Sequence, residues 1–313
     1  MGDTMKKLLK FGAISAFTLA GIGLGVLNAT GSGLDTWKSG KNHNRIIQVQ
    51  NEGGVQAGSG KVRVAYYSNS AFQITSPRGL TIMVDPWRND PSGAWGIWYR
   101  MEFPNAEVDI GMSTHAHFDH DAIGALEANM LLDRMAGDFT LGDVKITGIA
   151  DKHQCVAPGI IPWTDAVRQF EGRENICPPT NARHLDNNVY VIETGGMKFL
   201  MWGDNRPNPP KEVWDKIGKV DVVFVPVDGS EHILDYEQAD AVVAKSGAKI
   251  AVPHHYLVPE TTFVTSTLQP ATEWTQRHPH TLLKQAHFDI ARSDLKGKSG
   301  HVYYFGSHNM VTK

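Results

Sequence analysis

Short apolar runs separated by turn-forming residues begin at residue 62 and continue through most of the chain. The runs are rich in β-branched and aromatic residues and are bounded by Gly, Pro, Asn, Asp or Ser, which is typical of strands between turns. A glycine-containing turn inside two of them indicates hairpins. The pattern predicts strands at 62–67, 71–75, 80–86, 108–114, 220–228 and 248–256, and hairpins at 139–151 and 188–204.

Two segments have apolar residues at helical rather than strand spacing. Residues 121–137 predict a helix that stops at Gly137, and residues 235–247 predict a second helix. Hairpins in the first half of the body, followed by alternating strands and helices, indicate a layered α/β protein.

The first 60 residues differ in character from the rest. Three lysines precede an apolar run at 11–29, which is the build of an export signal. The run is also close to the roughly 20 residues that span a bilayer, so an uncleaved anchor remains an alternative. We therefore expect a signal peptide or membrane anchor at 1–29, a flexible Gly/Ser/Asn-rich linker at 30–60 and the folded body at 61–313. The protein is expected to be exported, whether periplasmic, secreted or membrane-anchored.

The charge composition limits the classes of partner that the protein is expected to bind. Charged residues make up 20% of the 313-residue chain and the formal net charge is −3. No basic excess is available for an electrostatic grip on a phosphate backbone, so no nucleic-acid partner is expected.

Histidines are numerous, 14 in all, and they concentrate in the sequence THAHFDHD at 114–121. In an extended segment His115 and His117 point the same way, because side chains alternate with a period of two. Asp119 and His120 follow where the chain turns away, and can aim at a second point. The arrangement, at the end of a predicted buried strand, suits two metal ions held close together.

His-x-His-x-Asp-His is also the signature of the metallo-β-lactamase superfamily, which this chain resembles over residues 62–257. The strand ending at Asp85 resembles the family's first motif, where the aspartate is usually structural. The strands ending at His153, Asp204 and His255 resemble the later ligand motifs. Within the superfamily, PVDGSEHILDYEQADAVV looks most like the L-ascorbate-6-phosphate lactonase branch. The resemblance implies a four-layer αββα sandwich.

The same resemblance implies a dinuclear centre with two divalent metal ions, zinc first, with Mn²⁺ or Fe²⁺ as alternatives. A hydroxide held between the ions would attack the substrate, and Asp119 would be the catalytic residue that orients it and moves its proton. One ion would be held by three histidines, the other by three further residues, and one aspartate would bridge them. The implied metal ligands are His115, His117 and His153; Asp119, His120 and His255; and the bridging Asp204.

Two ligand assignments have alternatives in the sequence. His184 competes with His153, since it also precedes a strand that leads towards Asp204. His254 competes with its neighbour His255. If a preferred residue is not the ligand, the competing histidine would take its position and the proposed chemistry would be unchanged.

Further residues are candidates for a substrate pocket. An aromatic-rich segment at 85–104 leads from one site strand to the next and could receive an apolar group or a lipid. The long insertion at 154–187 contains both cysteines, Cys155 and Cys177, which form either a disulfide or two free thiols. The pocket candidates are His184, His232, Arg206, Trp95 and Trp98.

Three functions are compatible with these residues. The first is a metal-dependent hydrolase that cleaves an ester, lactone or phosphodiester bond in a small-molecule or lipid substrate. The second is a lipid-directed phosphodiesterase similar to N-acylphosphatidylethanolamine phospholipase D, which the aromatic segment and the N-terminus favour. The third is an iron-dependent redox enzyme on the same scaffold.

Overall fold

The computed structural model describes residues 60–154, 185–263 and 268–312. The predicted targeting segment, nearly all of the linker, both cysteines and His184 lie outside these residues. Within them, no helix is both long enough and apolar enough to cross a membrane.

Two β-sheets form the body. The first is a six-stranded sheet in which β13, β1, β2 and β3 pair antiparallel, while β3, β4 and β5 pair parallel. In spatial order its strands are β13 (His287–Ile290), β1 (Val62–Tyr66), β2 (Phe72–Thr75), β3 (Thr81–Val84), β4 (Ala106–Ser113) and β5 (Leu126–Asp133).

The second sheet has eight strands. Its first five, from β12 to β9, are parallel, and the remaining pairs are antiparallel. In spatial order its strands are β12 (His280–Leu282), β14 (His301–Tyr304), β11 (Ile250–His254), β10 (Val222–Pro226), β9 (Met197–Met201), β8 (Asn187–Thr194), β7 (Val144–Asp151) and β6 (Gly137–Leu141).

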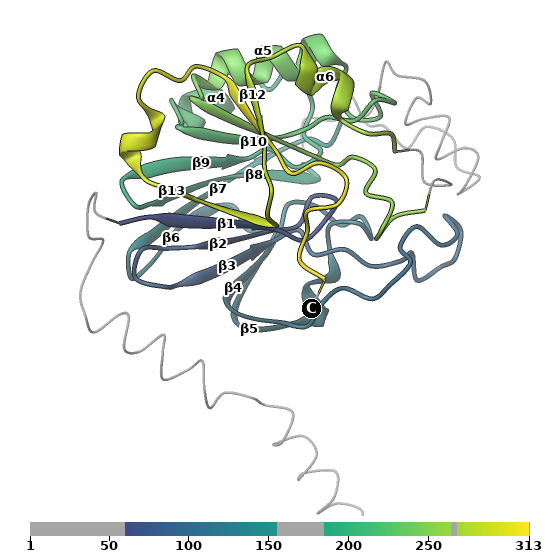
Figure 1. Cartoon of the computed structure of the whole chain (residues 1–313). Helices are drawn as coiled ribbons and strands as arrows, with labels where there is room; N and C mark the ends of the chain where they lie inside the picture. The colour runs from purple at the N-terminus through teal and green to yellow at the C-terminus, as the bar shows by residue number, and fades with distance from the viewer. Residues whose placement is uncertain (1–59, 155–184, 264–267, 313) are drawn as a thin grey trace, which may run out of the picture. The chain divides into compact units, whose positions relative to one another are not determined.

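The two sheets stack face to face, as Figure 1 shows, and enclose one large apolar core. Phe72 of β2 packs on Phe224 of β10 across the layer, with 4.6 Å between ring centroids. Such burial removes apolar side chains from water and is the main favourable contribution to folding. The expected α/β sandwich, with both predicted hairpins in place, is confirmed.

The α-helices lie on the outer face of the eight-stranded sheet (Figure 1). They are α4 (Lys211–Ile217), α5 (Tyr236–Ser246) and α6 (Thr272–Gln276), and two 3₁₀ turns are η1 (Ala122–Ala125) and η2 (Arg292–Leu295). The predicted second helix is α5. Asp235 and Gln238 form a capping box at its start, and Gly247 ends it with a φ of +74°.

The helix predicted at 121–137 is wrong. The structure has only η1 there, followed by β5, which pairs parallel with β4. Leu126 and Met130 are four apart, a spacing that both a helix and one face of a strand satisfy. Pairing with β4 decides between them, because Gly111 of β4 leaves room that the side chains of Leu126 and Leu131 occupy.

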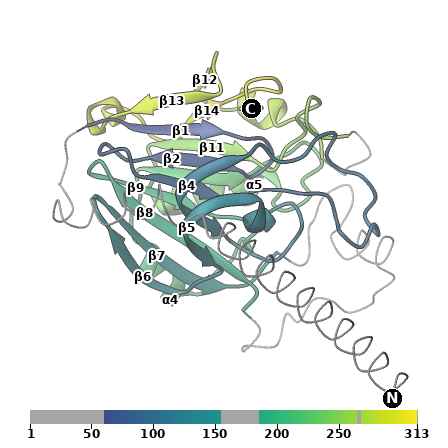
Figure 2. The same cartoon turned by 90° about the horizontal axis from the view of Figure 1, so that it is seen from below.

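On the six-stranded sheet the described residues include no α-helix, and the aromatic segment supplies a smaller core of its own. Trp87 and Tyr99 stack at 4.2 Å and are fully buried. They belong to a cluster with Met83 of β3 and Val108 of β4. Figure 2 shows β4, β5 and the connection between them from this side.

Gly148 of β7 packs against the segment between β5 and β6, where the chain passes from one sheet to the other. A Cβ at this position would lie 1.9 Å from the carbonyl oxygen of Met135. We expect Gly148→Ala to lower the free energy of unfolding by roughly 3 kcal/mol or more, since backbone must move to relieve the clash. Gly124, with nothing within 4 Å of its Cβ position, is the matched control. Urea denaturation should show Gly124→Ala near wild type, and equal losses for the two variants would contradict the packing described here.

Candidate metal centre

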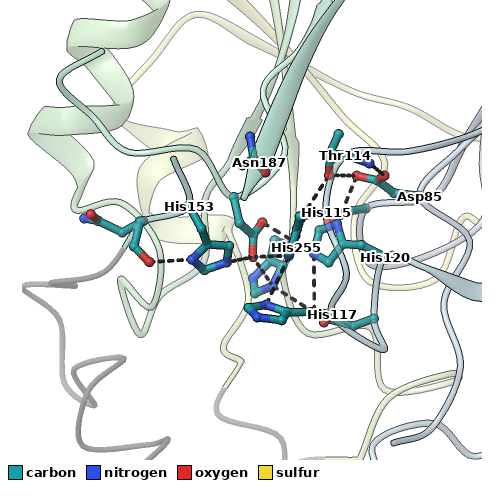
Figure 3. Close-up of polar contacts among 12 residues, drawn as sticks. Asp85, Thr114, His115, His117, His120, His153, Asn187 and His255 are labelled. Carbon is teal, nitrogen blue, oxygen red and sulfur yellow. Dashed lines mark hydrogen bonds and ion pairs between the residues drawn. The ribbon is translucent and has the colours of Figure 1, made fainter. Parts of the chain in front are cut away.

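Seven side chains from four strand ends meet at one edge of the sandwich (Figure 3). The segment after β4 contributes four of them, and β7, β9 and β11 each contribute one from just beyond their C-terminal ends. Each of these strands is extended and buried, so its last residues deliver the side chain to a fixed point. The seven are the expected ligands His115, His117, Asp119, His120, His153, Asp204 and His255.

Their donor atoms fall into three overlapping groups, each within 4.8 Å. The first group contains only histidines, and the other two mix imidazole and carboxylate. The groups are His115, His117 and His153; His115, His120 and Asp204; and Asp119, His120 and His255.

Asp204 lies at the centre of the cluster. Its Oδ2 is 3.6 Å from His153 Nε2 and 3.4 Å from His255 Nε2. Its Oδ1 is 3.4 Å from His120 Nε2. One carboxylate therefore faces both halves of the site, which is the position that a bridging ligand needs.

Asp119 is nearer to one half of the cluster. Its Oδ2 lies 3.1 Å from His255 Nε2 and 3.4 Å from His120 Nε2. The Asn69 side chain donates to the backbone carbonyl of Asp119 at 3.0 Å and so holds this part of the loop. The carboxylate is thus oriented at both its backbone and its side chain.

Asp85, at the end of β3, supports the centre from behind (Figure 3). It accepts hydrogen bonds from the Thr114 backbone N–H at 2.7 Å and the Thr114 hydroxyl at 2.8 Å. Its Oδ2 also lies 2.9 Å from Nδ1 of His120. A carboxylate on the far nitrogen of an imidazole fixes the ring and leaves Nε2 to face the site.

A second brace, which the sequence analysis missed, joins β8 to the segment after β9. Asn187 donates to Asn205 at 3.0 Å, and Asn205 donates to Asp151 at 2.8 Å. Both asparagines form backbone bridges to ligand residues, Asn187 to His115 and Asn205 to His153. Asparagine directly before or after a site strand was the only sequence signal for them.

Arg206 has a different place from the one expected. Its guanidinium is bonded to Asp151, with Nε 3.0 Å from Oδ1, and it is not among the residues that line the pocket. Because Asp151 also accepts from Asn205, the arginine belongs to the brace rather than to the substrate pocket.

The structure separates the two adjacent histidines that compete for the last ligand position. His255 faces the cluster, whereas His254 lies 2.9 Å from the Ser70 hydroxyl through its Nδ1 and packs edge-on to Phe72. His255 has a φ of +60°. This left-handed conformation turns the chain at the end of β11 and sends the two rings in different directions.

Strained backbone gathers around the centre. Of the six non-glycine residues with positive φ in the described chain, four are at or beside the cluster. Non-glycine residues adopt this conformation at a cost, and they are enriched at functional sites. The four are Ser68, Asn69, Asp85 and His255.

Burial sets the charge of the all-histidine half. It lowers the pKa of His115 well below the usual value, with the neighbouring imidazoles adding to the effect. It also lowers the pKa of His117 to about 3, with a further contribution from His153. Both rings are therefore neutral near pH 7, which is the form that binds a metal.

The carboxylates dominate the other half. Burial alone would raise the pKa of Asp204 and Asp119, but the surrounding histidines outweigh it and hold both well below the usual range. Burial likewise opposes protonation of His120 and His255, yet the carboxylates raise the pKa of both rings. The negative potential that favours a proton on these imidazoles would equally favour a divalent cation.

The donor set fits divalent metal ions. Nε2 of His120 and Oδ1 of Asp204 are buried and make no hydrogen bond within the described residues. Buried polar atoms without a partner are costly, and a ligand accounts for them. Imidazole nitrogen mixed with carboxylate oxygen suits zinc, and also iron or manganese.

A pocket opens over the cluster. It reaches Asp119, Asp204 and His255 on one side and an aromatic wall on the other. The expected pocket residues Trp95, Trp98 and His232 lie in it. Phe118, Arg88 and Asp90 also line it, and the sequence analysis did not select them. Phe118 lies inside the histidine motif, where only the metal-ligand pattern was considered.

His232 stacks on His255, with ring centroids 5.9 Å apart and planes within 3° of parallel. Burial and the nearby His255 lower the pKa of His232 to about 4. The ring is therefore neutral near pH 7, so one of its two nitrogens carries a hydrogen and the other does not.

The matched family model is the Beta-lactamase superfamily domain, which covers residues 63–255 and therefore more than half of the chain. The structure of a metallo-β-lactamase superfamily protein from Thermotoga maritima is similar to this one, with a TM-score of 0.54. That likeness covers 78% of this chain and 98% of the other, at 20% identity.

Sequence relatives agree. A UPF0173 metal-dependent hydrolase from Myxococcus xanthus is 34% identical over 206 residues, which are 63% of this chain and 71% of the relative. Another from Anaeromyxobacter sp. (strain K) is 25% identical over 215 residues, covering 64% and 77%. With its two stacked mixed sheets and its histidine–aspartate cluster, the chain belongs to the UPF0173 metal-dependent hydrolases of the metallo-β-lactamase superfamily.

Proposed function

We propose that this metal-dependent hydrolase cleaves a small ester or lactone that has an apolar acyl group, with two divalent metal ions, zinc first, as its cofactors. One observation carries the proposal: a wall of aromatic rings faces the ligand cluster across a single pocket. Trp98 meets Phe118 edge-on at 5.2 Å, and Trp95 lies 6.1 Å from Trp98. Such a wall binds an apolar group while the cluster acts on the polar bond beside it.

The charges in the pocket favour a neutral substrate. Arg88 is the one arginine or lysine among the described lining residues, and its guanidinium is already bonded to Asp121 at 2.9 Å. Three carboxylates, Asp90, Asp119 and Asp204, line the same pocket. Bound metal ions would neutralise Asp119 and Asp204, so Asp90 is the lining carboxylate that remains to disfavour an additional anionic group on the substrate.

The seven clustered side chains would hold the two metal ions. His115, His117 and His153 would hold one ion and Asp119, His120 and His255 the other, with Asp204 facing both. When bound, the ions acidify water and polarise the substrate carbonyl.

Asp119 and His232 act on the proton and the substrate. The Asp119 carboxylate, which lines the pocket, accepts a proton from the attacking water on one of its oxygens and returns it to the leaving oxygen. His232, which lines the same pocket, contacts the bound substrate. The aromatic wall excludes bulk water and positions the acyl group against these residues.

A lipid-directed phosphodiesterase is the second candidate, and one observation favours it. Ile97, which lies between the two tryptophans of the wall in sequence, is 65% exposed, so a large apolar side chain faces solvent in this segment. A lipid substrate would give this residue a partner.

The adjacent histidines provide a matched pair of variants. His255→Gln removes a donor from the cluster and should lower bound metal and reduce hydrolysis by roughly 100-fold or more. His254→Gln should keep its metal, with a stability loss on the order of 1 kcal/mol from the contact with Ser70. Metal content by mass spectrometry and the rate on a chromogenic ester are the readouts. Normal metal content in His255→Gln would remove this residue from the ligand set.

Metal removal tests the class of reaction. Dialysis against a chelator should abolish ester and lactone hydrolysis and lower the melting temperature, because buried carboxylates then lose their cation. Zinc or manganese should restore both. If the purified protein contains only iron and hydrolyses neither esters nor phosphodiesters, the result would favour redox chemistry instead.

The aromatic wall should determine substrate preference. Trp95→Ala should reduce kcat/KM for a phenyl-substituted or octanoyl ester by roughly 10-fold relative to an acetate ester, since only the larger acyl group uses the wall. Ile97→Ala, which alters an exposed neighbour outside the pocket lining, is the control for the small ester series. Equal losses on all esters in Trp95→Ala would argue against an apolar acyl site. A selective loss on phospholipid in Ile97→Ala would favour the second candidate.

A further inference from the structure

Basic side chains gather at the end of the sandwich that lies opposite the metal centre. Lys198 is at the start of β9, Lys219 shortly before β10, and Lys249 directly before β11. These three strands are parallel and deliver Asp204 and His255 at their other ends. Each strand has five residues, about 17 Å of extended chain, so the two groups are held apart by the sheet itself.

Two adjoining hollows contain these residues. They share Asp221, Lys249 and Arg292, and Glu193 is the other acidic residue of their lining. The lining residues of the two hollows therefore carry a formal net charge of +4, from six cations and two carboxylates, on a chain whose formal net charge is −3. The six cations are Lys198, Lys219, Lys249, Arg292, Lys296 and Lys298.

Little of this charge is neutralised locally. Lys198 is 3.7 Å from Glu193, and Arg292 is 3.8 Å from Asp221. Within the described residues the other four have no carboxylate in ion-pair range. Lys249 and Lys296 are both exposed, so their ammonium groups face solvent.

The chain enters the folded body at this same end. A Cβ on Gly60, the first described residue, would lie 2.5 Å from Pro77, and one on Gly195 would lie 2.6 Å from Val62. The Gly195–Gly196 turn lines one of the hollows, and the Gly196 carbonyl accepts a hydrogen bond from Arg292. In Figure 1 and Figure 2 the start of β1 and the turn that follows β13 are at the same end of the sheets.

We propose that this basic end docks on an anionic membrane surface and directs the metal pocket away from the bilayer. The 59 residues before it contain the apolar run at 11–29, which the sequence predicts as a signal or anchor. A segment held in the bilayer would bring the basic end close to the lipid phosphates. Six cations from separate chain segments, all at one end, match a plane of phosphate groups rather than one small anion. The proposal does not depend on ester or lactone hydrolysis, but it is incompatible with the lipid-directed candidate, whose pocket would have to face the bilayer.

Lysine footprinting of the full chain tests this placement. The protein would be bound to vesicles of phosphatidylcholine alone or with about 30% phosphatidylglycerol, and labelled with a water-soluble amine reagent. We expect labelling of Lys249 and Lys296 to fall about fivefold with the anionic lipid and to recover at about 0.5 M NaCl. Lys211 and Lys284, exposed at the start of α4 and after β12, should label equally in both.

Charge reversal gives the matched comparison. The double variant Lys249→Glu with Lys296→Glu should lose the additional vesicle binding that anionic lipid produces. Its partition coefficient on anionic vesicles should fall by about tenfold or more. Lys211→Glu with Lys284→Glu changes the net charge equally and should leave that binding unchanged. Equal labelling in both vesicle types, or equal losses in both double variants, would overturn the proposal. Protection of the two lysines by free inorganic phosphate or by a DNA oligonucleotide, without protection by vesicles, would also overturn it.

Discussion

The negative charge buried at Asp204 and Asp119 is the constraint on which this molecule depends. Two carboxylates without solvent are strongly unfavourable unless cationic or donating groups surround them. Five imidazoles do so, drawn from both sheets, and the folded chain can bring them together only if four strands end at the same edge. The fold around the centre is therefore the means by which these two charges are tolerated.

The supporting residues follow from the same requirement. An imidazole that must face a carboxylate or a metal with one nitrogen needs a partner for the other, and Asp85 supplies it to His120. The Asn187–Asn205–Asp151 brace has the corresponding role for the strands that present His115 and His153. Precision at the centre thus comes from groups that never touch the substrate.

Sequence patterns predicted most of the sheets and selected the seven side chains that the fold brings together, because both depend on short-range regularities. Alternating apolar residues identify a strand, and the spacing in THAHFDHD reports the turn that follows one. The patterns failed where contacts between residues distant in sequence determine the secondary structure or the partner of a side chain. The segment that begins at Leu126 satisfies helical spacing, and only β4 beside it selects the strand. Arg206 was assigned to the pocket because it is close to Asp204 in sequence, whereas its ion pair with Asp151 is visible only in three dimensions.

The left-handed backbone at Ser68, Asn69, Asp85 and His255 has a consequence for how this protein can change. Each such residue stores on the order of 1 kcal/mol or more of conformational strain, which glycine would relieve. At Asp85 and His255 that relief would delete a side chain of the centre. At these two positions, substitutions that relieve strain would also remove side chains of the metal centre. Laboratory evolution for thermal stability alone would therefore tend to lower activity at this site first.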